Sequence, residues 1–240
     1  MRLSGCIIAH NEADRIERAV RSLGFCDEVV VVDSGSTDGT DTLAEQLGAR
    51  VIRTDWPGHV AQKNRAIAAC SGEWVLSIDA DEWVSETLAH EVIAFLHAPS
   101  HRAASMPRRN HWLGTALAHG RWYPDRHVRL ALRKSATWKG EDPHDHLDAG
   151  SAFPLQQDLH HDPYRSLGEH LSTIDRYTRI AASQVKPRFF LFDLGVRPCW
   201  SFLRAYVVEQ GFRDGLPGFV LAVLGAVYVV LKYARARGLP

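Results

Sequence analysis

Short apolar runs alternate with amphipathic segments over the first hundred residues, and this alternation constrains the fold more than any other feature. Runs typical of strands lie at 3–9, 28–32, 50–53 and 73–78. Apolar residues with helical spacing lie between them, at 13–23, 37–47 and 59–69. The run at 28–32 is EVVVV, whose lack of polar alternation is typical of a strand covered on both faces. The pattern predicts an α/β fold with a mostly parallel, doubly wound sheet.

Charge is unevenly distributed along a chain whose formal net charge is zero. Residues 1–100 contain 8 basic and 16 acidic side chains, whereas residues 101–240 contain 20 basic and 12 acidic ones. The composition, 45% hydrophobic and 23% charged, is that of a folded protein and excludes a disordered or multi-span membrane chain. A nucleic-acid-binding protein would be basic overall, so we expect no nucleic-acid partner.

The cysteines and the N-terminal residues indicate the compartment. The four cysteines are widely spaced and form no CxxC pair, which predicts buried thiols and neither a disulfide framework nor a zinc site. The first residues, MRLSGCIIAHNE, lack the long apolar run of a signal peptide. We therefore expect a protein on the cytoplasmic side of the membrane.

Polar clusters follow three of the expected strands. Glu12 follows the first, Asp33 begins the run DSGSTDG after the second, and Asp79 and Asp81 directly follow the fourth. Ligands of open α/β sheets bind beyond the carboxyl ends of strands. Two carboxylates there suit Mg²⁺ or Mn²⁺, which takes its other ligands from water and substrate phosphates. The alternative is ordinary turn and helix-cap chemistry.

Two cations lie near the same predicted edge. Lys63 and Arg65 stand in an otherwise apolar helical segment and could meet a diphosphate, or they could belong to a solvated helix face. The chain contains neither a GxGxxG fingerprint nor a GxxxxGK[ST] loop, so we do not expect a dinucleotide-dependent dehydrogenase or a P-loop kinase.

Taken together, these segments resemble family 2 of the inverting glycosyltransferases, which share the GT-A fold. The resemblance rests on IIAHNE at 7–12, VVVDSGSTDGT at 30–40, QKNRA at 62–66 and LSIDADEW at 76–83. Within that family the chain is most similar to lipopolysaccharide core enzymes that add β-glucose to a heptose. That similarity continues through RRNHWLG at 108–114, GRWYPD at 120–125, PHDHL at 143–147 and HDPYRSL at 161–167, and into 206–215.

The resemblance implies a site for a nucleotide sugar. Glu12 and Asp33 would contact the uridine of UDP-glucose, and Lys63 and Arg65 would lie near the base or the diphosphate. A departing nucleoside diphosphate develops negative charge, which basic residues and a divalent cation stabilise.

The resemblance also implies a bound Mg²⁺ or Mn²⁺. Asp81 would be the main metal ligand, and Asp79 would lie beside both ribose and metal. Some enzymes of this fold complete the metal or diphosphate site with a late histidine, for which His161 is the candidate. The alternative for His161 is a hydrogen bond to the backbone before the next helix.

Inversion requires a general base that deprotonates the acceptor hydroxyl. Asp145 aligns with the second residue of the His-Glu pair in the heptose-glucosyltransferase subgroup, although aspartate is shorter by one methylene. Asp142, in the pair Glu141-Asp142, corresponds to the Glu-Asp pair of many family members. Asp145 is the preferred candidate, with Asp142 and then Glu141 as alternatives that remain open at this point.

The second half of the chain has the composition of an acceptor-binding region. Aromatic faces suit sugar rings and arginines suit phosphate, which together fit a phosphorylated, lipid-linked saccharide. The aromatic candidates are Trp112, Trp122, Tyr123 and Trp138, and the arginines are Arg108, Arg109, Arg121, Arg126, Arg129 and Arg133. The alternative is that the aromatics belong to the core and the arginines to a solvated surface.

The C-terminal region has the pattern of helices. Ser166 and Glu169 form a capping box at the start of an amphipathic segment, 164–184. Residues 215–231 contain no charge and are followed by Lys232 and Arg235. We expect a helix that lies in the interface of an anionic membrane, with a buried or a spanning helix as alternatives. The expected domains are 1–160, for nucleotide-sugar binding and catalysis, and 161–240.

The leading hypothesis is an inverting hexosyltransferase that moves glucose from UDP-glucose to a lipopolysaccharide inner core or another lipid-anchored saccharide. It would act at the cytoplasmic face of the inner membrane. Capsule, exopolysaccharide and undecaprenyl-linked acceptors remain alternatives. A nucleotidyltransferase would need a glycine- and arginine-rich loop where this chain has AHNE, and a DxD phosphatase would have its aspartates after the first strand. A non-catalytic membrane adaptor would not need the acids at 12, 33, 79 and 81.

Overall fold

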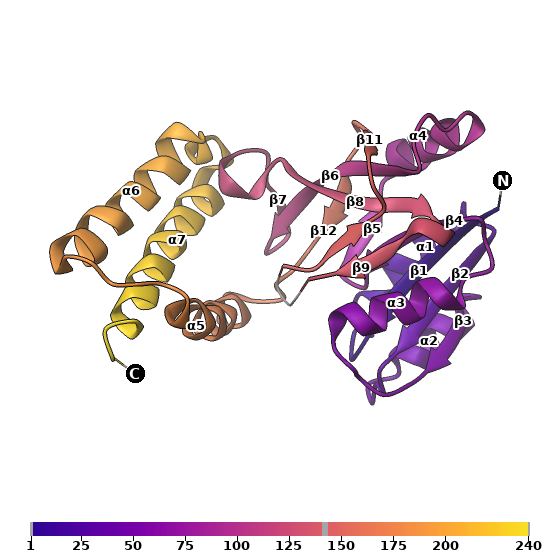
Figure 1. Cartoon of the computed structure of the whole chain (residues 1–240), viewed down its shortest axis with the longest axis horizontal. Coiled ribbons are helices and arrows are strands. Elements are labelled where there is room, and N and C mark those ends of the chain that lie inside the picture. The colour runs from indigo at the N-terminus through magenta and orange to yellow at the C-terminus, as the bar shows by residue number, and fades with distance from the viewer. Residues whose placement is uncertain (1, 141–143, 240) are drawn as a thin grey trace. The chain divides into compact units, whose positions relative to one another are not determined.

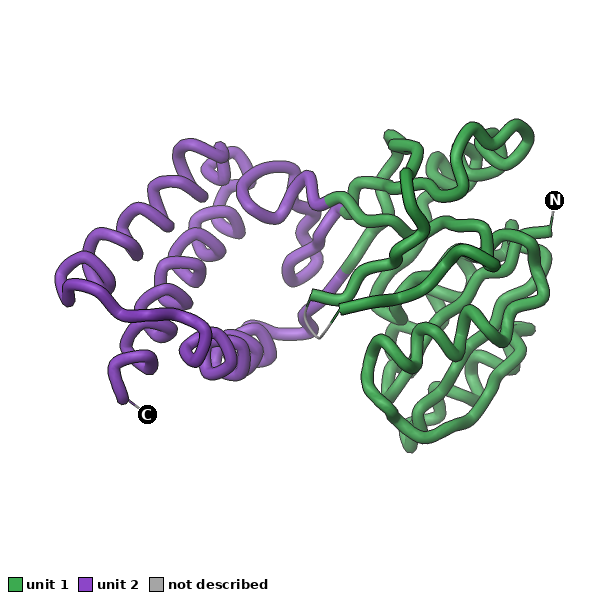
Figure 2. Tube along the Cα trace, in the orientation of Figure 1, with its two compact units in different colours: residues 1–108, 126–161 green, residues 109–125, 162–240 purple. Residues whose placement is uncertain are grey.

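The computed structural model describes residues 2–140 and 144–239. The chain divides into two compact units (Figure 2). Unit 1 comprises Met1–Arg108 and Arg126–His161, and unit 2 comprises Arg109–Asp125 and Asp162–Pro240. The expected domain boundary after residue 160 stays a prediction, because compactness does not establish independent folding.

Unit 1 is built on a mixed sheet whose first part is parallel. Strands β3 (Arg50–Arg53), β2 (Glu28–Asp33), β1 (Leu3–Ala9) and β4 (Trp74–Asp79) lie side by side in that order. The sheet continues with β8 (Asp125–Leu132), β6 (Ala103–Trp112), β12 (Leu159–His161) and β5 (Glu82–Val84). Strand β8 is antiparallel to β4, and β12 is antiparallel to β5. Strand β11 (Ala152–Pro154) pairs with β6, while β9 (Thr137–Lys139) and β10 (His146–Asp148) form a separate ribbon.

Helices cover both faces of this sheet (Figure 1). Helices α1 (Ile16–Ser22), α2 (Thr40–Gln46) and α4 (Glu86–His97) contribute to one apolar core, and α3 (His59–Ala69) with the β9–β10 ribbon contributes to the other. Side chains of β1 alternate between the cores: Ile7 packs in the first and Ile8 in the second. The expected mostly parallel, doubly wound α/β fold is confirmed. Strand β6 does not stand out in the sequence because its second half, RRNHW, is polar.

The strand register brings the polar clusters together. Ala9 of β1 lies opposite Asp33 of β2, and Ile8 lies opposite Asp79 of β4. The carboxyl ends of these three parallel strands therefore meet at one edge, with Asp33 and Asp79 on either side of the end of β1. This arrangement is the usual ligand-binding position of an open α/β sheet.

Glu28 links chain segments at the opposite end of these strands. Its Oε1 atom accepts hydrogen bonds from Ser4 Oγ at 2.5 Å, Ser71 N at 2.6 Å and Ser71 Oγ at 2.6 Å. Burial raises the pKa of Glu28, but these donors outweigh it and lower the pKa from 4.5 to about 2. The carboxylate therefore ties the starts of β1 and β2 to the turn before β4.

The hydrogen bonds of the Glu28 carboxylate make the stability of the fold depend on pH. Because the folded-state pKa of Glu28 is depressed, its contribution is complete above about pH 4.5 and is lost as the pH falls towards about 2. We expect Glu28→Gln to lower the unfolding midpoint at pH 7 and to flatten its decline between those values, measured by urea titration. Glu17→Gln, which removes an exposed pair with Arg21, is the control. An unchanged decline in Glu28→Gln would contradict the assignment.

Unit 2 is helical. It contains α5 (Leu167–Ser183), α6 (Arg197–Leu203) and α7 (Gly215–Arg235), with π-helical turns at Phe192–Val196 and Arg204–Val208 and the short strand β7 (Thr115–Ala116). The predicted cap is present, since Ser166 Oγ accepts a hydrogen bond from Glu169 N at 3.1 Å. Trp112, expected on an acceptor surface, instead packs in the apolar core of this unit, and its Nε1 donates to His170 Nδ1 at 3.1 Å.

Candidate active site

Lys63 joins two carboxylates at the carboxyl edge of the sheet. Its Nζ lies 3.0 Å from Asp79 Oδ1, at the end of β4, and 2.8 Å from Asp145 Oδ2, just before β10. The ammonium also lies 4.2 Å from the centre of the Trp138 ring. The lysine is buried, so this bridge is shielded from water. It brings together three residues proposed from separate parts of the sequence.

The residues on either side of Lys63 explain why the bridge forms. Gln62 Nε2 donates to Ser34 Oγ at 2.8 Å, which ties α3 to the loop after β2. Asn64 Oδ1 accepts from Trp138 N at 2.8 Å, and Asn64 Nδ2 donates to Trp138 O at 3.0 Å. These two hydrogen bonds hold the β9–β10 ribbon against α3 and so bring Asp145 within reach of Lys63.

Asp81 lies two residues after β4, beside a histidine from the far end of the sheet. His161 Nε2, at the end of β12, is 3.4 Å from Asp81 Oδ2. On another side, Arg15 Nη1 is 4.0 Å from Asp81 Oδ2 and 3.9 Å from Glu12 Oε2. The structure therefore gathers Asp81, His161 and Glu12 around one site, although they lie far apart in the sequence.

A buried ion pair lies beneath Asp79. Arg129 Nη2, on β8, is 3.1 Å from Asp79 Oδ2 and 2.6 Å from Glu82 Oε1. The second oxygen of Glu82 accepts the backbone N–H of Asp79 at 3.0 Å. The side chains of Arg129 and Glu82 are almost fully buried. The expectation that Arg129 and Trp138 belong to an acceptor surface is therefore wrong, because both are buried in unit 1.

These contacts keep the carboxylates ionised. Burial raises the pKa of Asp79, but the charges of Lys63 and Arg129 outweigh it and hold that pKa far below its usual range. Burial likewise raises the pKa of Asp81, and His161 lowers it more strongly. Burial lowers the pKa of Lys63, whereas Asp79 and then Asp145 contribute to a net increase. The site therefore holds full charges of both signs in a buried setting.

Asp33 is engaged within its own turn. Its Oδ1 accepts from Gly35 N at 3.0 Å and Ser36 N at 2.9 Å, and its Oδ2 accepts from Ser36 Oγ at 2.5 Å. The preceding loop is held alongside, because Asn11, at a φ of 56°, accepts Thr37 N through its Oδ1 at 2.9 Å. Asp33 thus shapes the loop at the predicted nucleotide edge.

Arg65 lies apart from the Lys63 bridge. The guanidinium of Arg65 bonds to Asp55 Oδ1 at 2.8 Å and to Thr54 Oγ1 at 2.9 Å, beside the end of β3. Asp142 lies outside the described residues. Sequence reasoning also passed over Arg15 and Glu82. An arginine inside an apolar strand run, as in VRLAL at 128–132, was the available signal for the buried pair.

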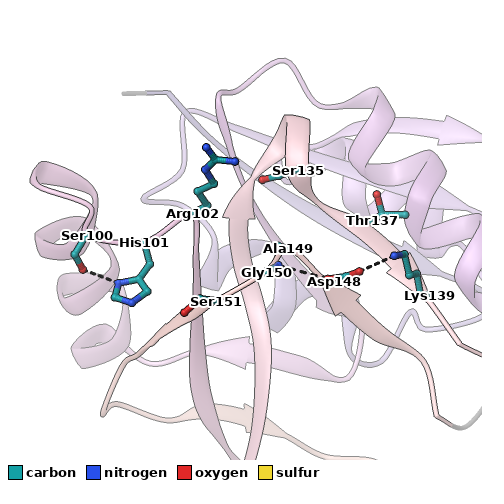
Figure 3. Close-up of a pocket in the computed structure, with 10 residues that line it drawn as sticks. All are labelled: Ser100, His101, Arg102, Ser135, Thr137, Lys139, Asp148, Ala149, Gly150 and Ser151. Atoms are coloured by element: carbon teal, nitrogen blue, oxygen red, sulfur yellow. Dashed lines mark hydrogen bonds and ion pairs between the residues drawn. The ribbon is translucent and has the colours of Figure 1, made fainter.

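A cavity of about 590 Å³ lies elsewhere in unit 1 (Figure 3). Its walls include Arg102, Ser135 and Thr137, and within it Lys139 pairs with Asp148 at 2.6 Å. Leu132, whose N–H bonds to Arg102 O, pairs with Trp74 at the start of β4. The cavity therefore lies towards the opposite end of β4 from Asp79, away from the candidate site.

The donor set fits a hard divalent cation. Among the described residues no cluster of three or more His, Cys, Asp or Glu side chains could enclose an ion by itself. Mg²⁺ and Mn²⁺ do not need one, since they retain waters and take ligands from substrate phosphates. Both oxygens of Asp79 already contact cationic groups, so Asp81 and His161 would be the better placed protein ligands for such an ion.

Comparisons with known proteins identify the family of this chain. The chain is 30% identical to an uncharacterized glycosyltransferase of Rickettsia felis, with 98% of this chain and 89% of that protein covered. It is 31% identical to the lipopolysaccharide core biosynthesis glycosyltransferase LpsC of Rhizobium meliloti, with 97% and 91% covered. The solved structure of the mannosyltransferase PcManGT from Pyrobaculum calidifontis, in complex with GDP-Man and Mn²⁺, shares the fold at a TM-score of 0.58, with 16% identity and 99% and 87% covered.

The family profile covers nearly the whole sheet and every candidate site residue. Residues 4–162 match the profile described as "Glycosyl transferase family 2". That span begins in β1, includes the Lys63 bridge and the Arg129–Glu82 pair, and ends one residue after His161. The chain belongs to glycosyl transferase family 2 and is a glycosyltransferase.

Proposed function

We propose that this protein is an inverting, metal-dependent hexosyltransferase that moves glucose from UDP-glucose to a lipid-linked saccharide. The observation that carries the proposal is the Lys63 bridge, in which one ammonium contacts Asp79 and Asp145. It sets a carboxylate able to accept a proton beside the strand end where a nucleotide sugar would bind. Asp145 is accordingly the proposed base, and Asp142 is the alternative.

The chemistry follows from charge. The acceptor hydroxyl gives its proton to the Asp145 carboxylate, its oxygen bonds to the anomeric carbon, and the bond from that carbon to the diphosphate breaks. Lys63 and Arg15 place positive charge near the acidic edge, where the leaving diphosphate develops negative charge. A bound Mg²⁺ or Mn²⁺, held by Asp81 with His161 and Asp79 beside it, would supply further positive charge there. Glu12, Asp33 and Arg65 are the remaining proposed contacts to the nucleotide.

The acceptor proposal rests on similarity and on one cavity in unit 2. LpsC is named for lipopolysaccharide core biosynthesis, which favours a lipopolysaccharide inner core over capsule or undecaprenyl-linked acceptors. Within unit 2, a cavity of about 720 Å³ is lined by Arg121, Tyr123, Arg204 and Glu209 among others. Two guanidinium groups and an aromatic ring suit a phosphorylated sugar. Attachment to the cytoplasmic face of the inner membrane would place this cavity near such an acceptor.

One genetic experiment tests substrate class and base together. We expect a strain lacking this protein to produce lipopolysaccharide lighter by one hexose, and we expect the wild-type chain, but not Asp145→Asn, to restore the mass. Purified Asp145→Asn should still bind UDP in the presence of Mn²⁺ by calorimetry, because the variant removes the proton acceptor and leaves Asp81 in place.

Three outcomes would contradict the proposal. Unchanged lipopolysaccharide in the deletion strain would exclude that acceptor. Full restoration by Asp145→Asn would exclude Asp145 as the base and direct attention to Asp142. Tighter binding of GDP than of UDP would overturn the donor, since the structurally similar mannosyltransferase was solved with GDP-Man.

A further inference from the structure

The helical segment 190–208 of unit 2 turns its large apolar side chains outward. It comprises α6 and the π-helical turns before and after it. Its outward side chains recur every three or four residues and so form one stripe: Phe192, Val196, Trp200, Leu203 and Val207. Each is at least 39% exposed, and Trp200 is 57% exposed. A contiguous exposed apolar stripe of this kind marks a surface that contacts a partner or a membrane.

The inward side of the same segment carries small side chains, two of which are polar. Asp193 is fully buried, and its carboxylate accepts from Arg188 N at 2.6 Å, Arg197 Nε at 3.0 Å and Arg237 Nη2 at 2.7 Å. Ser201 and Pro198 are also buried. Polar groups are therefore satisfied inside while apolar groups face outward, which is the arrangement expected beside a medium of low polarity.

Helix α7, which packs against α6, repeats the pattern (Figure 1). Its exposed stripe, between 36% and 73% accessible, consists of Leu216, Phe219, Val223, Val227 and Val230. Among the described residues, 211–235 is the one helix long and apolar enough to cross a membrane by length and composition, and its most apolar window is 17% buried. The two adjoining helices thus share an unusually apolar exterior.

The excess of basic side chains in this region favours an anionic partner for the apolar surface. Residues 186–237 contain eight Lys or Arg and three acids. Each acid is already bonded within the unit: Asp193 to the arginines above, Glu209 to Arg204 at 2.7 Å, and Asp214 to the backbone and ring of His119. The remaining positive charge suits anionic lipid headgroups. A second copy of the chain would bring the same positive charges to the contact.

We propose that the stripe Phe192–Val196–Trp200–Leu203–Val207, with the exposed face of α7, inserts in the plane of an anionic phospholipid bilayer. Arg197 and Arg204 lie within the 190–208 segment, and carrying them through the hydrocarbon core is strongly unfavourable, so the helix pair lies in the interface and does not span. The inference deepens the proposed membrane attachment. It moves the main contact from the uncharged 215–231 segment to the pair of helices, and it is independent of the glycosyl-transfer chemistry.

Vesicle binding of the full-length protein tests the proposal with a matched pair of tryptophans. Trp200 is 57% exposed on the stripe, and Trp56 is 46% exposed in unit 1. We expect Trp200→Gln to weaken binding to phosphatidylglycerol-containing vesicles by about tenfold or more and Trp56→Gln to leave it unchanged. Wild-type binding should fall on pure phosphatidylcholine and at high salt.

A second measurement uses the native thiol beside the stripe. Cys199 is exposed, whereas Cys6 and Cys70 are buried. In a Cys26→Ser background, an environment-sensitive fluorophore on Cys199 should shift to the blue on vesicle addition and should be quenched by lipids brominated near the headgroup. Quenching only by lipids brominated at the bilayer centre would overturn the in-plane position.

Other outcomes are equally decisive. Equal vesicle binding by wild type and Trp200→Gln would overturn the contact surface. A change of oligomeric state in Trp200→Gln without lipid would assign the stripe to a second copy. UDP binding with Mn²⁺ is measured on the same samples, so that a failure of the membrane contact is distinguished from a failure of the proposed function.

Discussion

Asp81→Asn is expected to reduce hexose transfer by about a thousandfold and to weaken Mn²⁺ binding in the presence of UDP. Asp81 is the carboxylate beside His161. Lys63 and Arg129 pair with Asp79, and in the described part of the chain neither pairs with Asp81. Replacing it with a neutral amide removes the negative charge that would hold the cation next to the diphosphate. Initial rates of UDP release and calorimetric titration with Mn²⁺ are the two measurements.

The matched control is Asp41→Asn. Asp41 lies on α2, where it pairs with Arg53 at 2.7 Å, so that its loss changes the charge of unit 1 by the same amount outside the candidate site. This variant should retain wild-type turnover and wild-type Mn²⁺ affinity. Turnover at the wild-type rate in Asp81→Asn, independent of added metal, would refute the metal assignment while leaving the family unaffected.

Arg129→Met is expected to destabilise the protein by about 3–5 kcal/mol, because it leaves the buried carboxylate of Glu82 without its closest cation. Glu82 has a fully buried side chain and depends on Arg129 at 2.6 Å, with Arg108 farther away at 3.4 Å. Asp79 would lose one of its two cationic partners. Urea unfolding followed by tryptophan fluorescence gives the free energy of unfolding.

Two further variants separate a buried ion pair from charge in general. Arg129→Met combined with Glu82→Gln should recover part of the lost stability, because the uncompensated charge is removed. Arg53→Met, which breaks exposed pairs with Asp41 and Glu45, should have a much smaller effect. If Arg129→Met proves as mild as Arg53→Met, the pair beneath Asp79 has no structural importance.

Local patterns in the sequence were sufficient for the first four strands and for the edge where they end. Two of these strands have the bounds expected, Leu3–Ala9 and Arg50–Arg53, because apolar runs and turn residues are local signals. The identity of motif residues likewise brought Lys63, Asp79 and Asp145 into consideration before their contacts were known. In the structure, Lys63 touches both acids, which lie 16 and 82 residues away in the sequence.

The second half of the chain could not be interpreted in the same way. Composition assigned Arg129, Trp112 and Trp138 to one acceptor surface, yet all three are buried, two in unit 1 and one in unit 2. An arginine in a strand can face solvent or can be buried against a carboxylate. Whether it is buried depends on whether the fold brings such a carboxylate beside it. Glu82, 47 residues away, is that partner.

The sequence by itself determined the class of fold, the sheet edge at which the candidate residues lie and the family, because strand patterns and short motifs depend on neighbouring residues. Only the tertiary structure decided that Arg129 and Glu82 support Asp79 from below, that Lys63 links Asp79 to Asp145, and that the 190–208 segment faces its apolar stripe outward. Each of these depends on which side of a strand or helix is covered by a distant part of the chain. A local pattern such as VRLAL at 128–132 can indicate that an arginine is buried, but it does not identify the partner, which is a property of the folded packing.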